Sequence, residues 1–432
     1  MSIYADRSDL IGSENAFKVG PYIREVEESG MRVIKCNLGE PDFSVPVHVR
    51  DAIKSALDED LTHYCDPQGI LPLRQAIAKQ VSDTRGIKVN PDQVVVFPGA
   101  KPAIGFSQQT YVNPGQEIIY PSPGFPIYES FATYIQAKPV PLHLQEEKNF
   151  SFGGEELAAL ITPRTRLIIL NFPSNPTGGL ASLAQLQEIA DVIKRHAPPD
   201  VRIFSDEIYE NIILDGGKHV SIASLPGMAE RTIISSGVSK TYAWTGGRVG
   251  WLVAPNADEA QRFKNLNINY FSCIPAYNQM GAKAALESPK SVGAIHEMVS
   301  AFRERRELVV DGLNSIPGIT CQRPQGAFYV FPNISGACKS LGVFDAYESL
   351  PSHVAERTTP ATLFQMFLLF VHGVASMDRK SFGAIGSDGL HFLRLSIATG
   401  SEDLKEGLKR IDKARQDKAG FAKFINDGKR LY

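Results

Sequence analysis

Short apolar runs and longer amphipathic stretches alternate along most of this chain, from about residue 48 to residue 297. The apolar runs are rich in Val, Ile and Leu and predict buried strands over residues 94–97, 167–170, 201–204, 232–234 and 249–253. Apolar positions at helical spacing predict helices over residues 49–58, 71–84, 183–195 and 279–287. Strands that alternate with helices in this way are typical of an α/β fold, in which helices cover a mainly parallel sheet.

The pattern changes on both sides of this region, so that three segments are predicted. Residues 1–47 contain an arm, a helix over 22–29 and an extended piece that reaches Gly39. Residues 48–297 form a large domain. A long, charged helix over 295–314 leads into the third segment, residues 298–432, which carries strands near 326–331 and 393–396.

Composition indicates the size of the core, the kinds of partner and the compartment, but it says little about function. A chain of 432 residues, 43% of them hydrophobic, can bury a large core. Its formal net charge of −2 gives no reason to expect nucleic acid or an anionic membrane as a partner, and the apolar stretch at 363–371 is too short to span a bilayer. The five cysteines are scattered without metal-ligand spacing, and no signal peptide is visible, which favours a reduced, cytoplasmic setting.

Polar residues follow four of the predicted strands at the point where each apolar run ends. Asn175 follows the strand over 167–170, Asp206 the strand over 201–204, Lys101 the strand over 94–97, and Lys240 the strand over 232–234. In an open α/β sheet, ligands bind beyond the carboxyl ends of the strands, so we expect these groups to meet at one edge. A lysine between buried strands must either find partners or shift its pKa and act as a nucleophile.

Several motifs, in order along the chain, complete the pattern. They are Asn37 to Phe43, Tyr64 to Gly69, Asn175 to Gly178, Asp206 to Tyr209, Ser239-Lys240 with Arg248, and Arg394 to Ser396. From about Phe17 to the final helix, the chain resembles a class I aminotransferase of the aspartate aminotransferase superfamily, whose fold-type I enzymes use pyridoxal 5′-phosphate. The resemblance implies a seven-stranded, mainly parallel sheet in the large domain and a smaller α/β domain built from both termini.

The resemblance also implies roles around the coenzyme. Lys240 would bind it covalently and carry the proton between the substrate α-carbon and the coenzyme. Asp206 would pair with the pyridine nitrogen, and Tyr209 and Asn175 would reach the 3′-oxygen. The two faces of the ring would be covered by Phe125 and Ile208.

The phosphate group would be bound by backbone amides and positive charge where a strand leads into a helix. The residues that the resemblance implies here are Gly99, Ala100, Lys101, Ser239 and Arg248. Tyr64 would reach the phosphate of a neighbouring subunit, which implies a homodimer with shared sites. Many relatives carry serine at the position of Gly237, so either Ser236 or Ser239 substitutes, or one hydroxyl contact is absent.

The resemblance also implies residues that bind the substrate. Arg394 suits the α-carboxylate because its planar guanidinium can hold both oxygens, and Gly39 and Asn175 would complete that site. Lys101 would meet the distal carboxylate of a dicarboxylic substrate, or serve the phosphate alone. Residues 340–360 look like an insertion, and residues 377–383 depart from the proline-glycine turn of many relatives, which could reshape the rim of the pocket.

Each site residue also has an ordinary structural interpretation. Asp206 could be a helix N-cap, Tyr209 packing, Phe125 a core aromatic, and Arg394 part of a surface salt bridge. The function that the resemblance implies is a ping-pong transaminase, with aspartate or another dicarboxylate as the amino acid. The alternatives are an aminotransferase for aromatic or neutral amino acids, a C–S lyase or related synthase on the same fold, and a coenzyme-binding regulator without catalysis.

Overall fold

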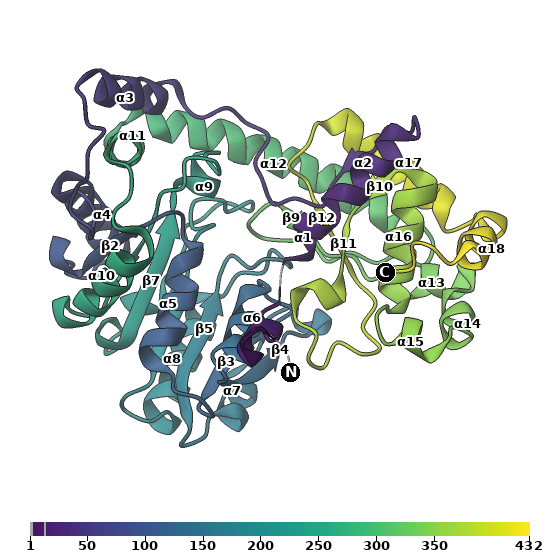
Figure 1. Ribbon diagram of the computed structural model, residues 1–432, viewed down its shortest axis with the longest axis horizontal. Coiled ribbons are helices and arrows are strands. Elements are labelled where there is room, and N and C mark those ends of the chain that lie inside the picture. The colour runs from purple at the N-terminus through teal and green to yellow at the C-terminus, as the bar shows by residue number, and fades with distance from the viewer. Residues whose placement is uncertain (1–2, 13) are drawn as a thin grey trace.

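The computed structural model describes residues 3–12 and 14–432, and its largest feature is a seven-stranded sheet (Figure 1). The strands lie side by side in the order β2 (Val94–Phe97), β8 (Gly250–Val253), β7 (Thr232–Gly237), β6 (Arg202–Asp206), β5 (Thr165–Asn171), β3 (Glu117–Ser122) and β4 (Lys138–His143). Neighbouring strands are parallel except at β8, which is antiparallel to both β2 and β7. β2 and β7 are both antiparallel to β8, so they point in the same direction as each other. The carboxyl ends of the six strands other than β8 therefore lie at one edge of the sheet.

The predicted α/β fold is therefore confirmed, and every strand predicted from an apolar run is present. The sequence pattern does not predict β3 and β4. Proline interrupts the apolar pattern in both strands, at Pro121 in β3 and at Pro139 and Pro141 in β4. β4 is the last strand of the sheet, where a residue without an N–H group is tolerated.

Alternate residues of the central strands face two different helical layers. Ile169 of β5 packs in the cluster that contains α5 (Lys101–Tyr111), α6 (Ile127–Tyr134) and α10 (Ala257–Phe271), whereas Ile168 and Leu170 pack toward α8 (Leu183–His196). Helices α3 (Val47–Asp58), α4 (Leu71–Arg85) and α11 (Ala276–Glu287) cover the β2–β8 end. Because both faces are covered, the central strands are apolar at nearly every position.

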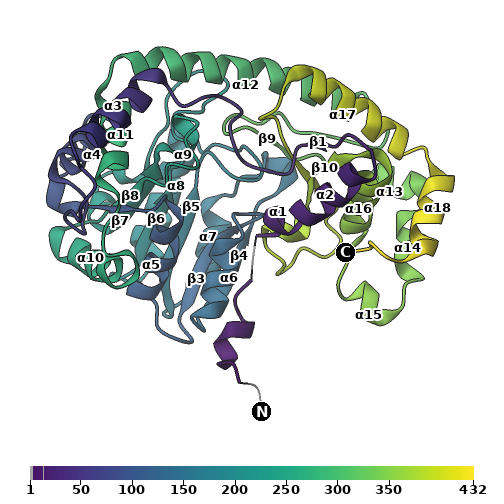
Figure 2. The same cartoon turned by 45° about the horizontal axis from the view of Figure 1, so that its top comes forward.

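A smaller α/β unit combines the two ends of the chain. Its N-terminal elements are α1 (Asn15–Lys18), α2 (Gly20–Glu28) and β1 (Ile34–Lys35). Its C-terminal strands are β9 (Tyr329–Val330), β10 (Val374–Ala375), β11 (Met377–Asp378) and β12 (Leu393–Ser396), and its helices include α16 (Pro360–His372), α17 (Ser401–Ala414) and α18 (Lys418–Asp427). β1 pairs in parallel with β10, and α2 lies beside α16 (Figures 1 and 2). The expected smaller unit from both termini is thus confirmed.

One long helix, α12 (Lys290–Asn314), connects the two parts and runs along one side of the molecule (Figure 2). It begins before the predicted start at residue 295 and continues through residue 297 without interruption. The domain boundaries at residues 47 and 297 therefore stay predictions.

The suspected insertion at residues 340–360 is largely helical. It contains the end of α13 (Ser335–Leu341), then α14 (Val343–Glu348) and α15 (Ser352–Ala355), and it ends where α16 begins. Phe344, Tyr347 and Leu350 pack against the core of the smaller unit. That the segment is an insertion stays a prediction.

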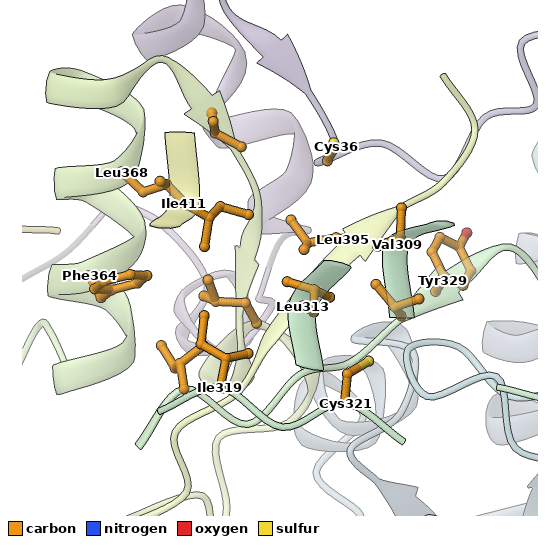
Figure 3. Close-up of a cluster of buried hydrophobic side chains, with 14 of the residues drawn as sticks. Cys36, Val309, Leu313, Ile319, Cys321, Tyr329, Phe364, Leu368, Leu395 and Ile411 are labelled. Carbon is orange, nitrogen blue, oxygen red and sulfur yellow. The ribbon is translucent and has the colours of Figure 1, made fainter. Parts of the chain in front are cut away.

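The core of the smaller unit is an apolar cluster with contributions from distant parts of the sequence (Figure 3). Cys36 from the N-terminal segment packs with Val309 and Leu313 of α12 and with Leu395 of β12. Burial raises the pKa of the Cys36 thiol to about 12, so this cysteine acts as a packing group and not as a nucleophile. Among the described residues, no helix combines the length and the apolar character needed to cross a membrane.

Candidate active site

A cavity of about 540 Å³ lies at the carboxyl edge of the sheet, between the sheet and the smaller unit. Most of the predicted site residues line it: Gly39, Ala100, Lys101, Phe125, Asn175, Asp206, Ile208, Tyr209, Ser239, Lys240, Arg248 and Arg394. The expectation that four strand ends converge on one edge is therefore confirmed by the geometry. Two predicted residues, Gly99 and Tyr64, are not among those that line it. Gly99 directly precedes the lining residue Ala100, whereas Tyr64 is 90% exposed and lies outside the cavity.

Lys240 lies in α9 (Val238–Thr241), the short helical turn that follows directly on β7. Its Nζ donates a hydrogen bond to the carbonyl oxygen of Gly39. Burial, together with the positive charge of Arg394, lowers the pKa of Lys240 to about 8. More of this amine is unprotonated at neutral pH than in an exposed lysine, as a nucleophile or a proton carrier requires.

Asp206 is the last residue of β6 and precedes a turn, so its alternative interpretation as a helix N-cap is wrong. Its Oδ2 accepts a hydrogen bond of 2.6 Å from the hydroxyl of Tyr128, a residue of α6 that sequence reasoning missed. Burial raises the pKa of Asp206 to about 6, although the bond from Tyr128 acts in the opposite direction. A cation beside this carboxylate, such as a protonated ring nitrogen, would stabilise its charged form.

The ends of β5 and β6 are fastened together by side-chain amides. Asn171 Nδ2 donates to the carbonyl of Asp206 at 3.1 Å, and its Oδ1 accepts from the N–H of Asn175 at 2.9 Å. The hydroxyl of Tyr209 lies 2.8 Å from that of Tyr329, a second aromatic residue that the sequence did not indicate. These bonds hold Asn175, Asp206 and Tyr209 on the same side of the cavity.

Arg394 is buried, with 4% of its surface exposed, so it is not part of a surface salt bridge. Its guanidinium donates to Oδ1 of Asn175 at 3.1 Å and to the carbonyl of Asn37, and it lies 4.5 Å from the ring centroid of Tyr329. Its Nε has no hydrogen-bond partner among the described residues, and its other nitrogens donate to an amide oxygen and a carbonyl instead of a carboxylate. A buried cation surrounded by neutral groups is suited to receive a carboxylate from outside.

A second set of donors lies where β2 leads into α5. Arg248 donates to the carbonyls of Pro98 at 3.0 Å and Thr245 at 2.8 Å. Because both acceptors are uncharged, neither neutralises the positive charge of Arg248. Gly99 has a φ of +88°, and a Cβ there would come within 2.2 Å of Arg248 Nη2, so only glycine allows this close approach. The helix N-terminus and the guanidinium together form a site for an anion.

The structure separates the two serines that could replace the hydroxyl missing at Gly237. Ser239 lines the cavity. Ser236 is buried elsewhere and donates to Oε1 of Glu210 at 2.7 Å. Of the two residues, Ser239 is therefore the one that can contact a ligand.

The departure at residues 377–383 forms β11 and a short 3-10 helix beside Arg394. Met377 is paired with Arg394 across the β11–β12 ladder, and the ring centroid of Phe382 lies 4.9 Å from the Arg394 guanidinium. This segment therefore forms part of the wall behind Arg394, in addition to any effect on the rim.

A buried ionic cluster supports the turn that presents Asp206 and Tyr209. Arg85 donates to Oε2 of Glu207 at 2.6 Å and 3.2 Å and also to Glu210, while the hydroxyl of Ser205 donates to Glu207 at 2.7 Å. Burial alone would raise the pKa of Glu207, but Arg85 holds that pKa well below its usual range. Glu207 directly follows Asp206, and Glu210 directly follows Tyr209. The ionic cluster therefore fixes the backbone that carries these two site residues.

The N-terminal segment supplies residues that sequence reasoning did not place in the site. Glu14, Ala16 and Phe17 line the cavity, and the carboxylate of Glu14 pairs with Lys101. No sequence pattern indicates these residues, because the contact between Glu14 and Lys101 joins positions that are far apart in the chain.

The chain matches the family described as aminotransferase class I and II over residues 32–411. This protein is a member of that aminotransferase family. It is 34% identical over 417 residues to an aromatic-amino-acid aminotransferase of Thermococcus litoralis and to an aspartate aminotransferase of Pyrococcus abyssi, with 96% of this chain and 98% of each relative covered. The solved structure of the aspartate aminotransferase from Rhizobium meliloti has a TM-score of 0.85 and 32% identity, and the match covers 96% of this chain and 99% of that one.

Class I aminotransferases use pyridoxal 5′-phosphate, and the cavity has a suitable group for each part of that coenzyme. Lys240 could offer an amine for the aldehyde, Asp206 a buried carboxylate for the ring nitrogen, and Arg248 with the start of α5 donors for the phosphate. When bound, the coenzyme supplies an electron-withdrawing ring that eases proton removal from the amino-acid α-carbon. The resemblance to this aminotransferase family is therefore confirmed.

Proposed function

We propose that this aminotransferase moves the amino group of a dicarboxylic L-amino acid to a 2-oxo acid in two half-reactions at one cavity. The observation that carries the proposal is that the cavity contains two cationic side chains, Arg394 and Lys101, that binding of the coenzyme ring does not require. Arg394 is buried among neutral oxygens, and Lys101 lies at the start of α5 with 44% of its side chain exposed. A substrate with two carboxylates matches two such cations.

The residues around the coenzyme divide into proton transfer and positioning. Lys240, with its lowered pKa, would accept the proton from the substrate α-carbon at its Nζ and later release it. Asp206 would pair with the ring nitrogen and favour its protonated form, while Tyr209 and Asn175 would donate hydrogen bonds to the 3′-oxygen. Phe125 and Ile208 cover the two faces of the ring, and this role for Phe125 fits its place in the cavity wall.

The phosphate and the α-carboxylate occupy opposite sides of the site in this proposal. Arg248, Ser239 and the amides of Gly99, Ala100 and Lys101 bind the phosphate. Arg394 binds the α-carboxylate together with Asn175 and Gly39. A Cβ at Gly39 would come within 2.0 Å of the Tyr329 hydroxyl, so glycine is needed where the chain passes this site.

An aromatic or neutral amino acid is the second candidate substrate. Lys101 Nζ lies 5.8 Å from the ring centroids of both Phe17 and Phe125, and Glu14 neutralises its charge. These rings provide an apolar wall against which an aromatic side chain could pack. The two relatives named above, one for aromatic amino acids and one for aspartate, are compatible with either preference.

A C–S lyase would use the same coenzyme and much of the same site. A lyase acting on a cysteine conjugate releases pyruvate and ammonia continuously, whereas a transaminase without a 2-oxo acid stops after one half-reaction. Product analysis in the absence of a 2-oxo acid therefore separates the two activities.

We further infer that the protein acts as a cytoplasmic homodimer. Tyr64 supports the dimer, because this aromatic side chain is almost fully exposed and lies outside its own cavity. Tyr64 also matches the tyrosine that, in class I aminotransferases, reaches the phosphate of the neighbouring subunit. The scattered free cysteines fit a reducing compartment.

Borohydride reduction of the coenzyme-loaded protein should attach pyridoxal phosphate to Lys240. The reason is that this buried amine has a lowered pKa and lies at the centre of the cavity. Peptide mapping by mass spectrometry locates the label, and Lys240→Ala serves as the unlabelled control. A label on Lys101 or on any other lysine would refute the assignment.

Hybrid dimers should show that each site uses Tyr64 from the partner chain. Tyr64→Phe and Lys240→Ala subunits are each impaired, but a mixed dimer regains one site in which both residues are native. The measurement is aminotransferase activity after the two variants are mixed, with each homodimer as its own control. If mixing restores no activity, or if the wild-type protein is a fully active monomer in sedimentation, the shared site is wrong.

Replacing Lys101 with alanine should lower kcat/KM for aspartate by roughly ten- to a hundredfold, because a hydrogen bond to a charged group is lost. The value for an apolar amino acid should fall much less. Lys79→Ala, which removes an exposed lysine paired with Asp83 on α4, is the matched control. Equal losses for both substrates would mean that Lys101 serves the coenzyme instead of the substrate.

A further inference from the structure

The N-terminal segment that leads into α1 lies where the smaller unit meets the sheet (Figure 2), and it contacts elements of both parts. Gly12 lies against α6, where a Cβ would come within 2.9 Å of Ser130 Cβ. Asn15 Nδ2 donates to the hydroxyl of Ser381 in the smaller unit at 2.9 Å. Close to these anchors in the sequence, Glu14 reaches the cavity and Phe17 forms part of its wall.

Glu14 is paired with Lys101, the cation that the proposed function assigns to the side chain of the substrate. Its carboxylate pairs with the Lys101 ammonium, and 14% of the Glu14 side chain is exposed. Burial lowers the pKa values of Lys240 and Arg394, and the charge of Glu14 acts in the opposite direction on both. The Glu14 carboxylate is thus part of the electrostatic environment in which the substrate binds.

We propose that Glu14 is a specificity-determining residue that competes with the acidic side chain of the substrate for Lys101. This inference rests on the proposed function, which assigns Lys101 to the distal carboxylate. When the substrate side chain is uncharged, Glu14 remains paired with Lys101 and the subsite is electrically neutral, with Phe17 and Phe125 as apolar walls. When the substrate is a dicarboxylate, its distal carboxylate takes Lys101 and Glu14 is displaced.

The competition follows from the charges on the three groups. One ammonium cannot neutralise two carboxylates at close range, so the displaced Glu14 must return to water or remain near a like charge. Acidic substrates therefore lose part of the attraction of Lys101, whereas aromatic substrates lose nothing. The strength of the Glu14–Lys101 pair sets the preference between the two classes.

The test compares two unreactive ligands that both offer one carboxylate to Arg394. Succinate adds a second carboxylate, and 3-phenylpropionate adds an aromatic ring. Calorimetric titration of the coenzyme-loaded protein gives both dissociation constants. In Glu14→Gln, the ratio of the two constants should shift in favour of succinate by roughly three- to tenfold, as expected for one partly exposed ion pair.

Two further variants show whether the shift comes from competition for Lys101. Glu27→Gln removes a glutamate of α2 that pairs with Lys35 at 2.8 Å, and it should leave the ratio unchanged. In a Lys101→Met background, Glu14→Gln should shift the ratio far less than in the wild-type background. An unchanged ratio in Glu14→Gln, or an equal shift in both backgrounds, would overturn the proposal.

The outcome is independent of turnover, because neither ligand carries an amino group. Loss of transamination with every amino acid would refute the proposed function without altering these dissociation constants. Conversely, an active aminotransferase with an unchanged ligand ratio would refute only the role of Glu14.

Discussion

The site depends on a buried guanidinium that has no carboxylate partner among the described residues. Arg394 contacts the carbonyl of Asn37 in the N-terminal segment, the amide oxygen of Asn175 at the end of β5, and the ring of Tyr329 in the smaller unit. One side chain thus connects three parts of the chain that are far apart in sequence. Because a desolvated cation is costly without an anion, the arrangement favours binding of a carboxylate at this point.

Burial also shifts two other ionisable groups of the site, Lys240 and Asp206, toward their neutral forms. It lowers the pKa of Lys240 to about 8 and raises the pKa of Asp206 to about 6. A neutral amine suits the nucleophile and proton carrier that transamination requires, whereas Asp206 must be charged to pair with a protonated ring nitrogen. The bond from Tyr128 favours that charged form of Asp206, as does the ammonium of Lys240 while it is protonated.

The parallel sheet explains why so much of the site can be predicted from the sequence. Strands covered on both faces appear as continuous apolar runs, and the residues after those runs, such as Asn175 and Lys240, necessarily meet at one edge. β3 and β4 could not be predicted in this way because prolines interrupt their apolar pattern.

The residues that sequence reasoning missed share a different property. Tyr128, Tyr329 and Glu14 reach the cavity through contacts between elements that are distant in the chain, and no local pattern distinguishes them from core or surface residues. Tyr64 shows the complementary case, because its predicted role requires a second copy of the chain. Local periodicity therefore predicts the strand ends but not the groups that other elements bring to them.

The most direct test of the central claim is a half-reaction measured without a 2-oxo acid. The coenzyme-loaded protein is mixed with single amino acids, and the absorbance of the coenzyme is followed together with the products. An aminotransferase converts the coenzyme to its amine form, releases one equivalent of 2-oxo acid per site and recovers when a 2-oxo acid is added. Continuous release of pyruvate and ammonia from a cysteine conjugate, or no conversion with any amino acid, would contradict the account.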